Sequence, residues 1–315
     1  MSENHRSRTL FRNRRGHLRA IWRMAIYLLI SVIALVPIMA IFKLLVTIFP
    51  FESRETGVTS TINLLFVLAL NIGFLVGAWI TLKRVDRRPV ALLGLNFWPV
   101  SLKEFSTGFA VGLVNFSAVF IFLLLAGWVS VDPAGISMSE LGIILKGIAV
   151  IFVFAAFEEL INRGYLFQAF CEGAGVWIAA VTISVIFSLV HIVNPAFSLI
   201  GGIFLFVHGL LYAAAYLKTR SLWTPIGLHM AWNLAQGPVA GMSVSGSDVG
   251  GSLFYATVDG PTVLTGGEFG IEGSVITVII SAIILMVVIN AKWLKPSARF
   301  LSIQRRVDQD PCRRP

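Results

Sequence analysis

The sequence has little charge and little cysteine. Only 13% of its 315 residues are Asp, Glu, Lys or Arg, whereas 57% are hydrophobic, and the mean hydropathy is +0.83. Soluble domains carry about 25% charged residues, so this composition excludes an ordinary soluble protein. Two cysteines, Cys171 and Cys312, are too few to indicate a disulfide framework. We predict that both lie in cytoplasmic segments, where thiols stay reduced.

Long apolar runs account for the high hydropathy. A membrane-spanning helix needs about 17 to 25 apolar residues, and about eight runs of suitable length can be read. They lie at about 24–49, 61–82, 106–130, 142–170, 176–193, 197–217, 222–240 and 274–294. The fourth run is too long for a simple span, so we expect its end to tilt, kink or lie along the interface. The predicted fold class is all-α, a polytopic helical membrane bundle.

The basic residues are distributed unevenly along the chain. They precede the first run and recur in alternate connections, whereas the connection at about 241–273 has no Lys or Arg and four acids. Cationic residues concentrate on the cytoplasmic side of membrane proteins, so both termini are predicted to be cytoplasmic. A net charge of +9 can also indicate nucleic-acid binding. The alternating placement favours contact with anionic lipids instead, so no nucleic-acid partner is expected.

No internal repeat or long low-complexity segment is visible, so one membrane domain is expected. We predict a basic cytoplasmic tail at 1–23, a helical membrane domain at 24–295 and a second basic cytoplasmic tail at 296–315. The connection at about 241–273 is rich in Gly, Ser and Thr and exceeds a plain connector in length. Two alternatives stay open for it: disorder, or a lid that folds back.

Two adjacent acids stand inside the fourth run, in "AAFEELINRG" at residues 155–164. An ionised side chain at the bilayer centre costs about 2.5 to 3.5 kcal/mol on insertion scales, so each acid needs a partner or a function. Glu159 and Arg163 are four residues apart on one helix face, which predicts an ion pair. Glu158 is rotated by about 100° from Glu159 and has no such partner. A proton-handling role is therefore expected for Glu158.

Further polar side chains stand at four-residue spacing in other apolar runs. Phe187 and His191 share a face in "FSLVHIVNP", and His229 and Asn233 share a face in "LHMAWN". If the chain turns near Gly173 to Gly175, Glu158 and His191 lie at similar depth and can face each other. Helix packing is the simpler explanation for Asn233. It is also the simpler explanation for His208, which has no comparable polar companion.

These side chains can form a hydrolytic site. Glu158, assisted by His191, can act as general base on a water, and His229 with Asn233 can donate hydrogen bonds to an oxyanion. Alternatively, Glu158, His191 and His229 can hold Zn²⁺, although the spacing is not HExxH. We favour no cofactor, and a divalent metal such as zinc stays an open alternative.

Three motifs, in this order, resemble those of the CPBP family of intramembrane proteases, also called the CAAX protease and bacteriocin-processing or Abi family. They cover about residues 142–240. "EELINR" is similar to the family's EExxxR motif, "FSLVH" to its FxxxH motif and "HMAWN" to its HxxxN motif; the matching residues are Glu158, Glu159, Arg163, Phe187, His191, His229 and Asn233.

The resemblance implies an eight-helix membrane fold and an endopeptidase similar to the Ras-converting CAAX enzyme, which removes the last three residues after a prenylated cysteine. It implies that Glu158 and His191 activate water and that His229 and Asn233 are oxyanion donors. The remaining motif residues would support the site. Whether such a protease is of the glutamate or the metallo type stays open.

The expected function is hydrolysis of a peptide bond in a membrane-associated or prenylated CAAX-type substrate, by a multi-pass protein of a bacterial plasma membrane. In a bacterium, another membrane peptide can replace the prenylated one. The alternative is non-enzymatic, as a membrane scaffold or bacteriocin self-immunity protein. A proton-coupled transporter is a third class, but the sequence lacks the repeats and broken helices typical of many transporters.

Overall fold

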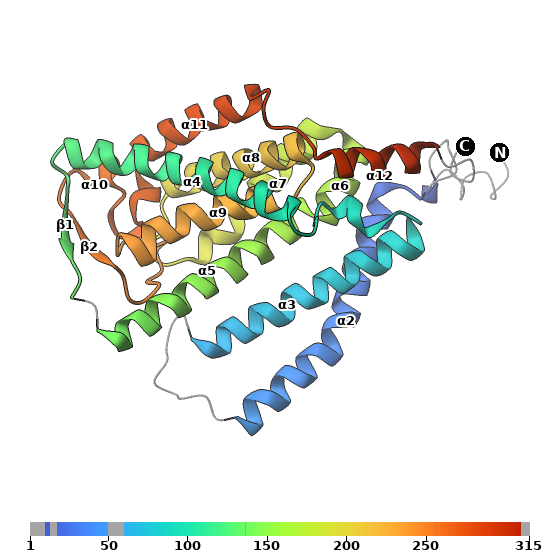
Figure 1. Ribbon diagram of the computed structural model, residues 1–315, viewed down its shortest axis with the longest axis horizontal. Helices are drawn as coiled ribbons and strands as arrows, with labels where there is room; N and C mark the ends of the chain where they lie inside the picture. The colour runs from blue at the N-terminus through green and yellow to red at the C-terminus, as the bar shows by residue number, and fades with distance from the viewer. Residues whose placement is uncertain (1–9, 13–17, 50–59, 136, 310–315) are drawn as a thin grey trace.

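The computed structural model describes residues 10–12, 18–49, 60–135 and 137–309, which form a bundle of helices with one two-stranded ribbon (Figure 1). Cys312 lies outside these residues. α9 packs against α4, α5 and α8, and α8 also packs against α7 and α11. α2 and α3 form a pair whose neighbours are α5 and α6. The predicted all-α membrane bundle is confirmed.

Within the described part of the chain, six helical segments are long and apolar enough to cross a membrane. They are α2 (Ala20–Ile48), α3 with the π-helical turn η1 (Thr61–Ile80 and Thr81–Val85), α4 (Val100–Leu125), α5 with α6 (Met138–Arg163 and Tyr165–Ala174), α7 with η3 (Val176–Val190 and His191–Val193) and α8 (Leu199–Thr219). Several apolar helices of this kind establish a multi-pass membrane protein.

Shorter helices stand at the last two predicted spans, so the expected count of eight is approximate. They are α9 (Trp223–Leu234), which continues into the π-helical η4 (Ala235–Val239), and α11 (Val275–Asn290). Most side chains of α9 are buried. The apolar side chains of the seventh run therefore contact other helices. A helix in that position does not have to face lipid along its length.

The fourth run contains the expected kink. α5 ends at Arg163, and α6 begins at Tyr165 after Gly164. A Cβ atom on Gly164 would lie 2.1 Å from the carbonyl oxygen of Leu160, so the sharp change of direction requires glycine here. The chain then turns at Gly175 into α7, where the sequence predicted the turn.

α4 and α9 approach each other through small residues. A Cβ atom on Gly108 would lie 1.8 Å from the carbonyl oxygen of Thr224, and one on Gly227 would lie 2.2 Å from that of Phe105. Such close contact between backbones is typical of helix packing in membranes. It fixes the position of α9, which carries His229 and Asn233.

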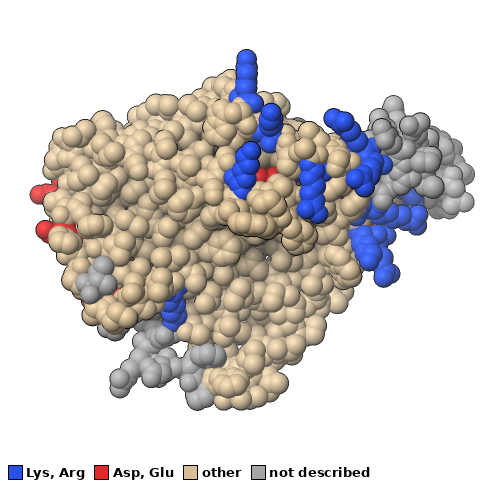
Figure 2. Space-filling model, in the orientation of Figure 1, with Lys and Arg blue, Asp and Glu red and all other residues tan. Residues whose placement is uncertain are grey.

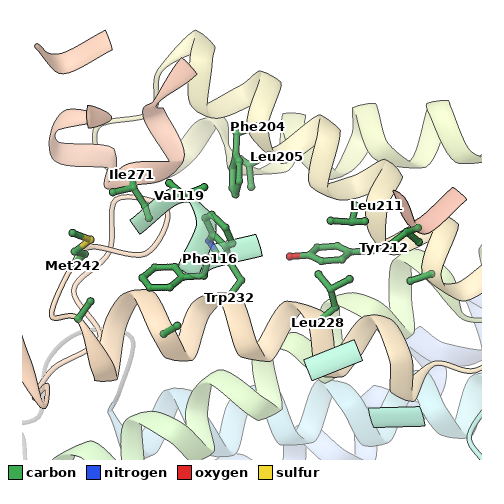
Figure 3. Close-up of a cluster of buried hydrophobic side chains, with 14 of the residues drawn as sticks. Phe116, Val119, Phe204, Leu205, Leu211, Tyr212, Leu228, Trp232, Met242 and Ile271 are labelled. Atoms are coloured by element: carbon green, nitrogen blue, oxygen red, sulfur yellow. The ribbon is translucent and has the colours of Figure 1, made fainter. Parts of the chain in front are cut away.

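The connection after η4 is folded, so the disordered alternative is wrong. Strand β2 (Phe254–Val258) pairs antiparallel with β1 (Val129–Pro133), with Val129 opposite Val258. The short helices α10 (Thr262–Thr265), η5 (Gly267–Phe269) and η6 (Ile271–Gly273) follow. The connection buries apolar side chains in the molecule: Met242, Val244, Val249, Phe269 and Ile271. Figure 3 shows Met242 and Ile271 beside the cluster around Phe116 and Trp232.

Charge is segregated along the long axis of the molecule. Figure 2 shows that Lys and Arg gather toward the end where Figure 1 places α12 (Ala298–Gln309) and both chain termini. The acids visible in the same view lie mainly at the opposite end, near β1 and β2. Beside the basic end, η2 (Val90–Leu93) contacts α12. This pattern supports cytoplasmic termini, and the orientation itself stays a prediction.

Candidate active site

One cavity of about 230 Å³ holds all four residues that the sequence predicted to be catalytic. Glu158 reaches it from α5, His191 from the first position of η3, and His229 and Asn233 from α9. The supporting Phe187 also lines it. Residues from three separate helical segments, which the sequence shows only as three local motifs, therefore lie around one cavity.

Glu158 presents a carboxylate oxygen that no protein group satisfies. Its Oε2 atom is buried, and no described residue donates a hydrogen bond to it. The nearest imidazole atom is Nε2 of His229, at 3.9 Å, which is too long for a direct hydrogen bond. An unpaired buried acceptor costs about 1 to 3 kcal/mol, and more when it is charged. This oxygen is therefore well suited to accept a hydrogen bond from a water in the cavity.

Glu159 points to a different set of partners. Its Oε1 atom lies 3.1 Å from Arg163 Nη1, and both side chains are fully buried, which confirms the predicted ion pair. The same oxygen lies 3.1 Å from Nδ1 of His229. Because an ionised carboxylate only accepts hydrogen bonds, Nδ1 carries a proton and donates. The ring of His229 is thereby held with Nε2 toward Glu158.

Arg163 is fixed on several sides. Nη2 donates to the backbone oxygen of Gly209 at 2.8 Å, and the guanidinium lies 5.1 Å from the ring centre of Phe187 and 5.2 Å from that of Tyr212. These contacts hold a buried cation beneath the cavity wall. The sequence predicted that Arg163 fixes Glu159, and the structure adds the aromatic faces of α7 and α8.

His191 lines the cavity with one ring nitrogen committed. Its Nδ1 lies 2.7 Å from the backbone oxygen of Phe187, so Nδ1 donates to that carbonyl and Nε2 is free to accept. The histidine that comes within 4 Å of the Glu158 carboxylate is His229, not His191. Glu158 and His191 thus share the cavity without direct contact, and the role of each residue stays a prediction.

Comparison with known protein families gives a match within this helical core. Residues 140–235 match the family described as Type II CAAX prenyl endopeptidase Rce1-like. The match confirms the resemblance to the CAAX proteases, and it supports protease activity. No curated protein and no solved structure matches the chain. The Rce1-like segment contains Glu158, His191, His229 and Asn233, whereas β1, β2 and the connection beyond residue 240 lie outside it.

A second acid of the cavity, Glu272, comes from outside the Rce1-like segment. It stands in η6, is 2% exposed, and accepts hydrogen bonds from Trp232 Nε1 at 3.1 Å and Ser245 Oγ at 2.6 Å. Burial raises the pKa of Glu272, and these two hydrogen bonds and the neighbouring His191 act in the opposite direction. The sequence predicted an external acid here, because nothing local to "GIEGS" shows that the segment folds inward.

Two further polar residues of the cavity, His208 and Tyr212, come from α8. Sequence reasoning assigned His208 a structural role and did not select Tyr212. Their four-residue spacing was a signal of the same kind as in the three motifs, but an isolated tyrosine in an apolar run does not distinguish a core residue from a site residue. The structure stacks Tyr212 on His229 and places His208 against Tyr212.

The described residues contain no group of three or more His, Cys, Asp or Glu side chains arranged to hold a metal ion. Nδ1 of His229 is committed to Glu159, and Nδ1 of His191 to a backbone carbonyl. Both contacts leave Nε2 of each histidine as the nitrogen that could bind a metal, so the zinc alternative with Glu158, His191 and His229 stays a prediction. The expectation that the protein needs no cofactor stays a prediction.

Proposed function

We propose that this protein is an intramembrane endopeptidase that hydrolyses a peptide bond with a water activated by Glu158. The unpaired, buried Oε2 atom of Glu158 carries this proposal, because a catalytic base must present a free acceptor to its water. Its place in the same cavity as His191, His229 and Asn233, inside the Rce1-like segment, supports the same conclusion.

In the proposed reaction the water donates two hydrogen bonds, one to Glu158 and one to Nε2 of His191. Glu158 takes its proton as the water oxygen bonds to the carbonyl carbon of the substrate. The carbonyl oxygen becomes an oxyanion, which hydrogen bonds from the amide of Asn233 and from Nε2 of His229 stabilise. This role requires His229 as an imidazolium, with Nδ1 donating to Glu159 and Nε2 to the oxyanion. Glu158 then passes the proton to the leaving nitrogen as the carbon–nitrogen bond breaks. Glu159 and Arg163 keep His229 oriented throughout.

The proposed substrate is a membrane-associated peptide. The cavity walls include the apolar side chains Val150, Ile151, Phe154, Leu205 and Val249 beside the polar residues, so a peptide with apolar side chains next to the cleaved bond would fit. A prenylated CAAX-type protein is one member of this class, and an unprenylated membrane peptide is another.

The test compares the new peptide termini in membranes of cells that carry the wild type or Glu158→Gln. We expect a set of termini that the wild type produces and Glu158→Gln does not. Glu268→Gln is the matched control, because Glu268 is an exposed acid outside the cavity, and this variant should produce the wild-type set. Identical termini in all three strains would contradict peptidase activity and favour the non-enzymatic alternative.

A further inference from the structure

The ring of Tyr212 lies against His229. The two ring centres are 4.8 Å apart and the rings are 16° from parallel, so Tyr212 covers one face of the proposed oxyanion donor. Figure 3 shows the hydroxyl oxygen of Tyr212 directed toward the side on which Phe204, Leu205 and Trp232 lie. These three residues and Tyr212 itself line the cavity, so the hydroxyl is directed toward the part of the cavity wall that Phe204, Leu205 and Trp232 form.

A buried network connects this hydroxyl to two other helices, α4 and α11. The Tyr212 hydroxyl oxygen is 3.0 Å from Nδ1 of His208. On the far side of the ring, Nε2 of His208 lies 3.1 Å from the amide nitrogen of Asn115 and 3.1 Å from Ser281 Oγ. The amide of Asn115 also donates to Ser281 Oγ at 3.2 Å, and Ser281 Oγ donates to Asn115 Oδ1 at 3.4 Å.

These contacts determine which nitrogen of His208 carries the proton. With the Asn115 amide oriented as in the structure, its nitrogen faces Nε2 of His208 and is only a donor, so Nε2 accepts from it. A neutral imidazole that accepts at Nε2 carries its proton on Nδ1, and Nδ1 therefore donates to the oxygen of Tyr212. The proton of the Tyr212 hydroxyl is left without a partner in this network. It is free to donate into the cavity.

We propose that Tyr212 is a further catalytic residue of this protein, which donates a hydrogen bond to the oxyanion, and that His208 is the positioning residue that directs the Tyr212 hydroxyl proton toward it. This inference rests on the proposed peptidase function. Tyr212 belongs to α8, so the oxyanion would be bound from two helices, α8 and α9. Apolar walls around the hydroxyl strengthen such a bond, because little water competes for it.

The first test is Tyr212→Phe, which keeps the ring that stacks on His229 and removes only the hydroxyl. The substrate is an internally quenched farnesylated CAAX peptide in liposomes or, if the wild type does not cut it, a peptide identified by the terminus comparison. We expect kcat to fall about 10²- to 10³-fold, the usual loss of one oxyanion donor, with KM little changed. Tyr216→Phe is the matched control, since Tyr216 is equally buried one turn along α8 but does not line the cavity.

Wild-type kcat in Tyr212→Phe, together with loss of cleavage in Glu158→Gln, would overturn the role of Tyr212 and leave the proposed function intact. Undiminished cleavage by Glu158→Gln would instead overturn the proposed function. An equal loss in Tyr212→Phe and Tyr216→Phe would show a packing effect and would also overturn the inference.

The second test needs no substrate. Nitrogen NMR of histidine-labelled protein distinguishes the two neutral tautomers, and assignment by comparison with His208→Gln identifies the signals of His208. We expect a protonated Nδ1 and an unprotonated Nε2. The reverse tautomer would mean that Tyr212 donates to His208 rather than into the cavity, and it would contradict the proposal.

Discussion

One carboxylate oxygen of Glu159 holds both Arg163 on its own helix and His229 on α9, each at 3.1 Å. The two adjacent acids of "FEEL" therefore differ in what they do. Each acid has one buried carboxylate oxygen without a hydrogen-bond partner, but Glu158 lines the cavity, whereas the other oxygen of Glu159 contacts Arg163 and His229. The ion pair that the sequence predicted is also the support that orients a proposed catalytic histidine.

Glu159→Gln should therefore lower both stability and activity. The amide cannot neutralise the buried Arg163, and breaking such a pair costs about 3 to 5 kcal/mol. It also weakens the hold on His229, so we expect kcat to fall in the protein that stays folded. The measurement is the unfolding midpoint together with kcat, beside Glu158→Gln, which should lose activity alone. A Glu159→Gln protein as stable and as active as the wild type would contradict this arrangement.

Gly108→Ala should destabilise the bundle and reduce activity together. The added methyl group would lie 1.8 Å from the carbonyl oxygen of Thr224, so α4 and α9 must separate, which displaces His229. Overpacking of this kind costs about 1 to 3 kcal/mol or more. Gly142→Ala on α5 is the control, because nothing lies within 4 Å of its added Cβ. Alanine there should be neutral or stabilise α5 by up to about 1 kcal/mol. The unfolding midpoint and the cleavage rate of both variants check this; equal effects would refute it.

Glu272 should make the packing of the connection at 241–273 depend on pH. Burial raises the pKa of Glu272 above the usual value of 4.5, so the folded state binds the proton more tightly than the unfolded state does. The stability contributed by Glu272 is then fully present below pH 4.5 and is lost as the pH rises through the raised pKa. Hydrogen exchange of backbone amides in 242–258 should become faster over that range, after correction for intrinsic exchange. Glu272→Gln should remove this dependence, and an unchanged profile in that variant would contradict it.

The helices and the motif faces could be predicted from sequence because both are local. Apolar runs set the positions of the long helices, and four-residue spacing puts Glu159 with Arg163 and His229 with Asn233 on shared faces. The length of the fourth run predicted a change of direction without placing it at Gly164, and Gly173 to Gly175 marked the turn. Those features depend on residues that are close together in the sequence, so a local sequence pattern is enough to predict them.

The missed residues depend on contacts between distant segments. Glu272 stands in a Gly-rich connection and accepts a hydrogen bond from Trp232 on α9, and no pattern within the connection reveals that partner. His208 became a site residue only because α8 packs beside α9. The same reason explains why Glu158 approaches His229 more closely than the expected His191: equal depth in two helices does not specify how each is rotated.

The central claim is that Glu158 is the base that activates water. Its most direct test is the rate of peptide hydrolysis by purified protein in liposomes, for the wild type and for Glu158→Gln, with the unfolding midpoint of each measured in the same preparation. The account predicts a loss of about 10²- to 10⁴-fold in rate at an unchanged midpoint, because the amide has nearly the same shape as the carboxylate and Oε2 makes no hydrogen bond that the substitution would break. Full hydrolysis by a folded Glu158→Gln protein would contradict the account.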